Sequence, residues 1–172
     1  MYFALKNNAK MIYAFELQEH VFNILQKNIE LNHISNIKTF NIALGKANSF
    51  GTFYHSSDPR TDWYGGLLNF GSQHIHVAED SEHGQLKIQS LDEVIQQENP
   101  PTIDFIKCDV ERFEYEVLQG AKETLLKYKP IIFIEIMPEN IERVFAYLEI
   151  LGYVKIKDLA SNNYLFQHKD KI

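Results

Sequence analysis

The sequence has 172 residues, of which 45% are hydrophobic and 23% are charged, and these values are typical of one soluble globular domain. The formal net charge is −6, and because no block of Lys and Arg residues occurs we expect no nucleic-acid partner. The single cysteine excludes an internal disulfide. No leader-like segment or long apolar run is present, so we expect a cytoplasmic protein without a membrane span, whose partner is a small molecule.

The first half of the chain begins with an apolar run and continues with a helical pattern. Residues 11–15 predict a strand, and apolar residues at helical spacing over 17–31 predict the helix that follows. Two further strands are expected over 37–44 and 49–55. The glycine-containing stretch 56–84 lacks sustained periodicity, so we expect it to be the most irregular part of the chain, either as a lid over the substrate or as a partly disordered insertion.

The second half alternates strands and helices more regularly. The expected strands cover 84–90, 103–110 and 130–136, and the expected helices cover 90–97, 114–127 and 138–151. Ser90 is the expected N-cap of the first of these helices, and residues 152–169 predict a closing hairpin. Strands that alternate with helices indicate an α/β fold with a mostly parallel sheet and an antiparallel C-terminal edge.

Glu16 directly follows the first expected strand. Ligands of open parallel sheets bind at the carboxyl ends of the strands, and a carboxylate there can accept hydrogen bonds from both hydroxyls of a ribose. An acid at this position is equally consistent with the start of a helix, where the helix dipole stabilises negative charge. The residue alone therefore leaves a nucleoside site and a solvent-exposed helix start as alternatives.

Charged residues interrupt the strand expected over 103–110. Because side chains alternate along a strand, Lys107, Asp109 and Glu111 share one face. A central parallel strand is normally apolar on both faces, and burying unpaired charges is costly. These groups must therefore pair, bind a ligand or emerge at the strand's end, and their clustering favours a functional site over a structural ion network. Cys108, on the other face, is expected to be an ordinary core residue.

The stretch DFIKCDVERFEYEVLQGA (104–121) resembles the signature of the FkbM-type methyltransferases, in which Lys-x-Asp-x-Glu-Gly-x-Glu follows an apolar residue and precedes a Leu-x-Gly-Ala helix. Other segments resemble the family in the same order: IYAFE (12–16), LQKNIELN (25–32), NIALG (41–45), KIQSLDEVI (87–95) and KPIIFIEI (129–136). This ordered agreement covers nearly the whole chain. It implies a single Rossmann-like methyltransferase domain over 1–172.

The resemblance implies an enzyme that uses S-adenosylmethionine to methylate a hydroxyl oxygen of a sugar, polyketide or similar metabolite. By position, it implies that Glu16 holds the ribose and that Ala43 lies beside the adenine. Asp109 and Glu111 would face the methyl-transfer end, where Asp109 also contacts the cofactor and an acid orients or deprotonates the acceptor. We therefore expect Glu16, Asp109 and Glu111 to converge at the carboxyl edge of one parallel sheet.

The chain departs from the family pattern in two places. Arg112 stands where the family has glycine, which adds a cation beside the site and removes backbone freedom. No glycine occurs before Gly45, so the first strand and glycine-rich turn of the family are missing and we expect an N-terminally incomplete sheet. One alternative function is therefore a noncatalytic remnant or fragment of the methyltransferase fold with a compromised cofactor pocket. A nicotinamide-dependent oxidoreductase is another, and the residues around Asp109 argue against it.

His74 and His76 share a face if their segment is extended, which makes a metal site one interpretation of this segment. Glu79 or His83 could supply a further ligand. Because a bound metal needs three or four convergent ligands, a solvent-exposed loop is the favoured interpretation. We expect no metal.

Overall fold

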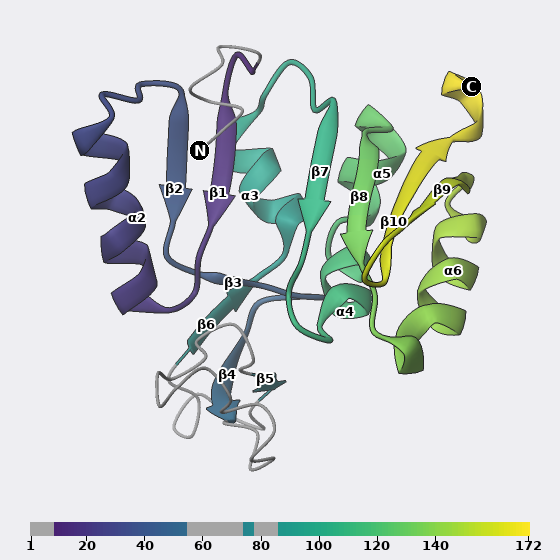
Figure 1. The fold of residues 1–172 in the computed structure, drawn as a ribbon, viewed down its shortest axis with the longest axis horizontal. Coiled ribbons are helices and arrows are strands. Elements are labelled where there is room, and N and C mark those ends of the chain that lie inside the picture. The colour runs from purple at the N-terminus through teal and green to yellow at the C-terminus, as the bar shows by residue number, and fades with distance from the viewer. Residues whose placement is uncertain (1–8, 55–73, 78–85) are drawn as a thin grey trace.

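The computed structural model describes residues 9–54, 74–77 and 86–172, which form a mixed α/β fold with strands in three sheets (Figure 1). The strands are β1 (Ile12–Phe15), β2 (Ile37–Phe40), β3 (Ala43–Leu44), β4 (Ser49–Tyr54), β5 (His74–Val77), β6 (Leu86–Gln89), β7 (Phe105–Cys108), β8 (Ile131–Glu135), β9 (Tyr153–Leu159) and β10 (Asn163–His168). The α-helices are α2 (Glu19–Leu31), α3 (Leu91–Glu98), α4 (Glu114–Gln119), α5 (Lys122–Tyr128) and α6 (Ile141–Ile150). Short 3-10 helices cover η2 (Pro138–Asn140) and η3 (Lys169–Lys171).

The parallel strands occur as pairs. β1 pairs with β2, β7 pairs with β8, and β3 pairs with β6, each in parallel register. In Figure 1 the β1–β2 pair and the β7–β8 pair run in the same direction, and β1 is on the side of its pair toward β7. Within the described residues β1 and β7 belong to different sheets, so the strand ends that we expected at the edge of one parallel sheet belong to two sheets.

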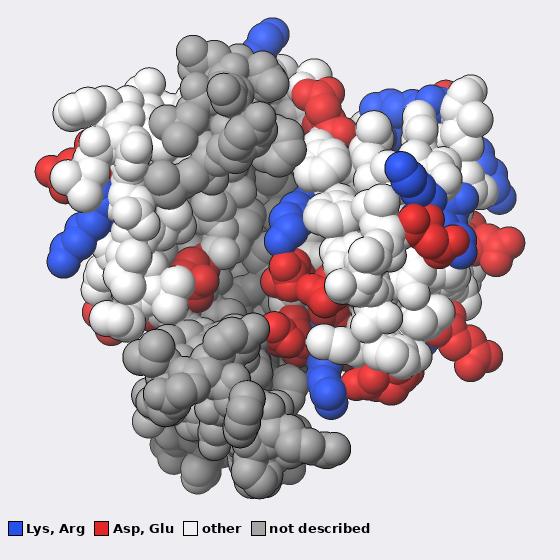
Figure 2. All heavy atoms as spheres, in the orientation of Figure 1, with Lys and Arg blue, Asp and Glu red and all other residues white. Residues whose placement is uncertain are grey.

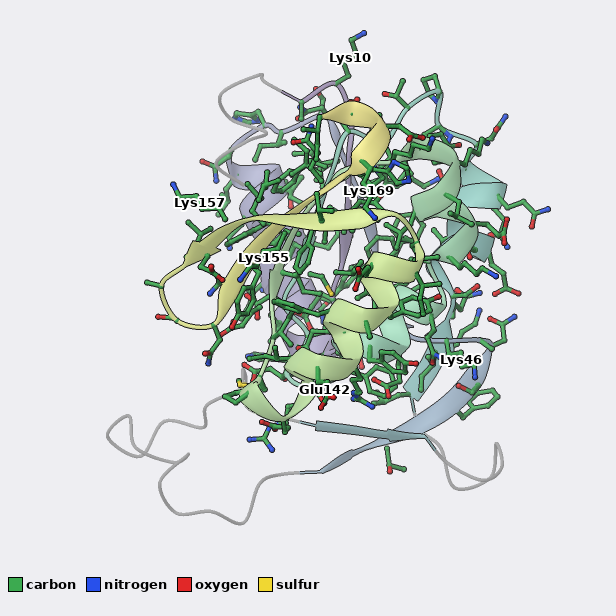
Figure 3. All side chains as sticks on the ribbon, turned by 90° about the vertical axis from the view of Figure 1, so that its right-hand side faces the viewer. Lys10, Lys46, Glu142, Lys155, Lys157 and Lys169 are labelled. Carbon is green, nitrogen blue, oxygen red and sulfur yellow. The ribbon has the colours of Figure 1, made fainter. Side chains whose placement is uncertain are left out.

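The C-terminal edge is antiparallel, as the sequence predicts. β10 pairs antiparallel with β8 and β9 pairs antiparallel with β10, which gives the order β7-β8-β10-β9. Figure 3 shows this hairpin beside α6, with Lys155 and Lys157 along β9. The ring of Phe145 on α6 meets the rings of Tyr164 and Phe166 edge-on, so aromatic contacts fix the helix against the hairpin.

The hydrophobic core belongs to the second half of the chain. Its buried members lie between Leu91 and Phe166, and Ile132, Ile134 and Leu148 have no exposed surface. They come from α3 to α6 and from the sheet that contains β7 and β8. By contrast, α2 has no buried residue.

The helix expected over 114–127 is two helices, α4 and α5. The chain breaks at Gly120, where a Cβ atom would lie 1.9 Å from the backbone oxygen of Gly45. The Gly120 carbonyl accepts a hydrogen bond from the backbone N–H of Asp92. The Asp92 carboxylate in turn accepts the N–H groups of Glu123 and Thr124 at 3.0 and 2.8 Å. A residue of α3 thus caps the start of α5.

The expected helix start at Ser90 is confirmed. Its side chain accepts a hydrogen bond from the N–H of Glu93 at 3.2 Å. The strand expected over 37–44 is divided into β2 and β3, and the helix expected over 138–151 begins with η2 before α6. Cys108 is buried in the core as expected, and burial raises the pKa of its thiol far above the ordinary value.

Candidate functional site

Two neighbouring strands end in carboxylates. The parallel register places Cys108 opposite Ile134, so Asp109 and Glu135, the next residue on each strand, lie side by side at the carboxyl edge. The Lys107 Nζ lies 2.6 Å from the Asp109 Oδ2, which confirms that these two charged residues share a side of the strand.

The turn after β7 has an unusual backbone. Glu111 and Arg112 have φ angles of 49° and 78°, in the left-handed region that side chains other than glycine adopt at an energetic cost. Two contacts hold the turn in place: the Arg112 N–H donates to the Glu114 Oε1 at 2.9 Å, and the Asn140 Nδ2 donates to the Arg112 carbonyl at 3.1 Å. The position where the family pattern has glycine therefore has the backbone conformation that glycine favours.

The Arg112 side chain is directed to Glu139. Its Nη1 lies 3.2 Å from the Glu139 Oε1, and both side chains are about half exposed. The expected cation beside the site is therefore present, but its charge is paired with an acid of η2.

The acids at this edge influence one another. Burial raises the pKa of Glu111, and repulsion from Asp109, Glu135 and Glu114 raises it further, while Arg112 lowers it. For Glu135, burial and repulsion from Asp109 raise the pKa, against a lowering effect of Lys107. We call Asp109, Glu111, Glu114 and Glu135 the carboxylate cluster, and Figure 2 shows acidic side chains gathered over the ends of β7 and β8.

Glu114 is the most buried member of the carboxylate cluster, with 1% of its surface exposed. Burial raises its pKa, and hydrogen bonds that favour the ionised form, including the one from the Arg112 N–H, oppose this effect. Glu114 starts α4 and closes the strained turn, so it supports the conformation of the residues that precede it.

Glu16 lies at the carboxyl end of β1, in the other parallel pair. Its Oε1 accepts the backbone N–H of Gln18 at 2.8 Å, and its backbone is held by Phe40 and by the side chain of Asn41. One carboxylate oxygen of Glu16 therefore accepts a hydrogen bond from the residue that caps α2. This contact agrees with the alternative in which Glu16 belongs to the start of the helix. The ribose role stays a prediction.

Ala43 belongs to the third sheet, where it pairs with Ile88. Its surface is 2% exposed, so its side chain presents little area to a ligand in this structure. The expected site residues thus come from three sheets. Asp109 and Glu111 lie together in the carboxylate cluster, whereas Glu16 ends a strand of the same direction in a separate sheet (Figure 1).

Glu135 is a member of the carboxylate cluster that the sequence did not single out. It lies near the end of the apolar run PIIFIEI (130–136), which by itself predicts only a strand. An acid at the end of an apolar strand, one strand along from Asp109, is the signal that could have identified it.

The histidine hypothesis is tested only in part. The backbone of His74 and His76 lies in β5, opposite Tyr54 and Thr52, so the segment is extended as supposed. Glu79, His83 and most of the segment 56–84 lie outside the described residues, and so does the prediction that this segment is irregular. Among the residues that the structure describes, no group of three or more His, Cys, Asp or Glu side chains could hold a metal ion.

Within the described ranges, no helix has the length and apolar character needed to cross a membrane.

The parallel strand pairs and their terminal carboxylates define a mixed α/β protein with a polar site at the ends of its strands. A family model of the methyltransferase FkbM domain matches residues 1–155, and the chain belongs to this family.

A solved structure supports the fold. The chain is similar to the methyltransferase FkbM from Methylobacillus flagellatus KT, with a TM-score of 0.55 and 15% sequence identity. The alignment covers 92% of this chain and 36% of that one, so the chain corresponds to about a third of the length of that protein. No curated protein matches the sequence.

Proposed function

We propose that the protein is an S-adenosylmethionine-dependent methyltransferase with a Rossmann-like fold. It transfers a methyl group to a hydroxyl oxygen of a sugar, polyketide or similar small metabolite. The observation that carries this proposal is the carboxylate cluster at the ends of β7 and β8, within the segment that resembles the signature of the family. Membership of the FkbM family supports the reaction class.

The charges of the carboxylate cluster suit this cofactor. S-Adenosylmethionine supplies a methyl group on a positively charged sulfonium and also has an ammonium group. The mutual repulsion that raises the pKa of Glu111 and Glu135 is relieved when a cation lies nearby. The donor set of the site therefore fits a cationic cofactor.

In the proposed arrangement, Glu16 accepts hydrogen bonds from the ribose hydroxyls and Ala43 lies beside the adenine. Asp109 and Glu111 are at the methyl-transfer end, where Asp109 also contacts the cofactor. Either acid orients the acceptor hydroxyl and takes its proton, a function that contributes roughly 10²–10⁴-fold to a rate. Lys107 holds Asp109 in place through their ion pair.

The test is transfer of an isotopically labelled methyl group from S-adenosylmethionine to a panel of hydroxyl-bearing sugars and polyketides. We expect a labelled acceptor, and we expect Asp109→Asn and Glu111→Gln each to lower the rate by roughly 10²-fold or more. Glu142→Gln, an exposed change on α6 (Figure 3), is the matched control and should leave the rate unchanged. Equal rates in all four proteins would contradict the proposal.

A second function, a noncatalytic remnant of the fold, is favoured by one observation. β1, which presents Glu16, and β7, which presents Asp109, lie in separate sheets within the described residues. Failure to transfer the label to any acceptor, together with undetectable binding of S-adenosylmethionine, would support this second function.

A further inference from the structure

Asn41 is the first residue after β2, and it lies at the same sheet edge as Glu16. The parallel register pairs Phe15 with Phe40, so Glu16 and Asn41, the next residue on each strand, are neighbours where the two strands end. The Glu16 N–H donates to the Phe40 carbonyl at 3.1 Å, which continues the pairing of the strands to the start of the turn. The side chain of Asn41 is therefore attached to a backbone that the strand pairing holds.

The amide of Asn41 holds the turn that presents Glu16. Its Nδ2 donates to the Glu16 carbonyl at 2.8 Å and to the Leu17 carbonyl at 3.2 Å. A side-chain amide has two N–H groups to donate, so one residue after β2 can fix two successive peptide units between β1 and α2.

The same turn restricts the carboxylate of Glu16. Its Oε1 accepts the Gln18 N–H at 2.8 Å, so the direction of the carboxylate depends on the backbone between Glu16 and Gln18. The contacts of Asn41 hold this backbone. Without them the carboxylate would belong to a turn with more conformations, and a ligand would have to order this turn when it binds.

Asn41 also lies between the two residues proposed for the nucleoside of the cofactor. Two positions further along the chain, Ala43 is buried and pairs with Ile88 in the third sheet. The segment from Phe40 to Ala43 is thus held by strand pairing at both ends, and Asn41 joins it to the turn of Glu16. This contact fixes the ribose end of the proposed site relative to the adenine end.

A second asparagine makes the same kind of contact at the other end of β2. The Asn36 Nδ2 donates to the Ala9 carbonyl at 2.9 Å, before β1 begins. Each asparagine thus joins a residue beside β2 to a carbonyl beside β1. Of the two, Asn41 does so at the carboxyl edge, where ligands of open parallel sheets bind. A comparison of Asn41 with Asn36 therefore separates a role in ligand binding from a structural role.

We propose that Asn41 is a positioning residue of the cofactor site, which holds the turn after β1 so that the Glu16 carboxylate meets the ribose hydroxyls. This inference rests on the proposed function. Asn41 acts through Glu16, so its contribution to the affinity for the cofactor disappears when the Glu16 carboxylate is removed.

The test is a calorimetric titration of S-adenosylmethionine into the unsubstituted protein, Asn41→Ala, Glu16→Ala and the double variant. We expect Asn41→Ala to weaken binding by about 2- to 10-fold, because the cofactor must then order the turn and the Glu16 side chain. In the Glu16→Ala background the same change should have no further effect, since residues that act as one unit are not additive. Asn36→Ala is the matched control and should leave the affinity unchanged.

A purely structural role of Asn41 predicts a different pattern. An unchanged affinity in Asn41→Ala, an equal loss in Asn36→Ala, or a loss that persists in the Glu16→Ala background would overturn the inference and leave the proposed function in place. If Asn41→Ala does not fold, Asn41→Leu serves instead, because it keeps the approximate size of the side chain without the N–H donors, and it should show the same loss. No binding by the unsubstituted protein would refute the proposed function, and the inference with it.

Discussion

The two halves of the molecule are packed very differently. The N-terminal unit (β1, α2 and β2, residues 12–40) has no fully buried residue in its helix or in its two strands. The C-terminal unit (α3 to β10, residues 91–168) contains nearly all of the buried core. Asp109 and Glu135 therefore lie at the end of a well-packed sheet of the C-terminal unit. Glu16 belongs to the N-terminal unit, which is packed more loosely. The end of the site proposed for chemistry is preorganised to a greater degree than the end proposed for the ribose.

Few contacts connect the two units. Phe15 at the end of β1 packs against the hydrophobic core of the C-terminal unit. The Lys38 Nζ on β2 lies 2.6 Å from a carboxylate oxygen of Glu98 on α3. Among the described residues, the packing of Phe15 against the core and this surface ion pair therefore link the N-terminal unit to the C-terminal unit.

The largest expected difference between the units is in the cost of truncating an apolar side chain. Leu148→Ala removes a side chain with no exposed surface and should lower the free energy of unfolding by about 2–5 kcal/mol. Ile24→Ala, in α2, removes a side chain that is 46% exposed and should cost less than about 1 kcal/mol. Urea unfolding of both variants would measure this, and equal losses would contradict the comparison.

The sequence predicted the features of the fold that depend on local patterns. The Ser90 cap, the order of strands and helices and the closing hairpin follow from short-range periodicity and capping chemistry. The break at Gly120 did not follow, because it depends on the close approach of Gly45, which is 75 residues away along the chain (120 − 45). The division into three sheets depends on long-range pairing of strands in the same way.

The sequence likewise predicted the part of the site that depends on local patterns. The alternation of charged residues identified Asp109 and Glu111, and the spacing of Lys107 and Asp109 predicted that they share a side. Glu135 was missed because its importance comes from its neighbour on the adjacent strand. The left-handed turn at Arg112 was not predicted, because no local pattern of side chains requires it there.

A smaller effect is expected at the turn of the C-terminal unit. Arg112→Gly relieves the left-handed backbone at φ 78° and should raise the free energy of unfolding by about 1 kcal/mol relative to Arg112→Ala. The alanine variant is the matched control, because both changes remove the exposed ion pair with Glu139. Urea unfolding gives the difference, and a glycine variant less stable than the alanine variant would show that the turn is not strained.

The smallest effect is expected at the ion pair between the two units. Lys38→Met should lower the free energy of unfolding by about 0.2–1 kcal/mol, because the lysine is half exposed and the pair is screened by solvent. Raising the salt concentration should reduce this loss. Lys155→Met, which removes an exposed pair with Asp158 within β9, is the control. Proteolysis of the N-terminal unit should increase in the first variant alone, and equal cleavage of both would show that Lys38 does not attach this unit.

The most direct test of the central claim, that carboxylates at the ends of β1 and β7 hold one nucleoside cofactor, is a calorimetric titration with S-adenosylmethionine. Losing the hydrogen bonds of Glu16 to the ribose should weaken binding by about tenfold or more in Glu16→Ala. Glu19→Ala, an exposed change in the first turn of α2, should leave the affinity unchanged. Equal affinities in the three proteins, or no binding by the unsubstituted chain, would contradict the account.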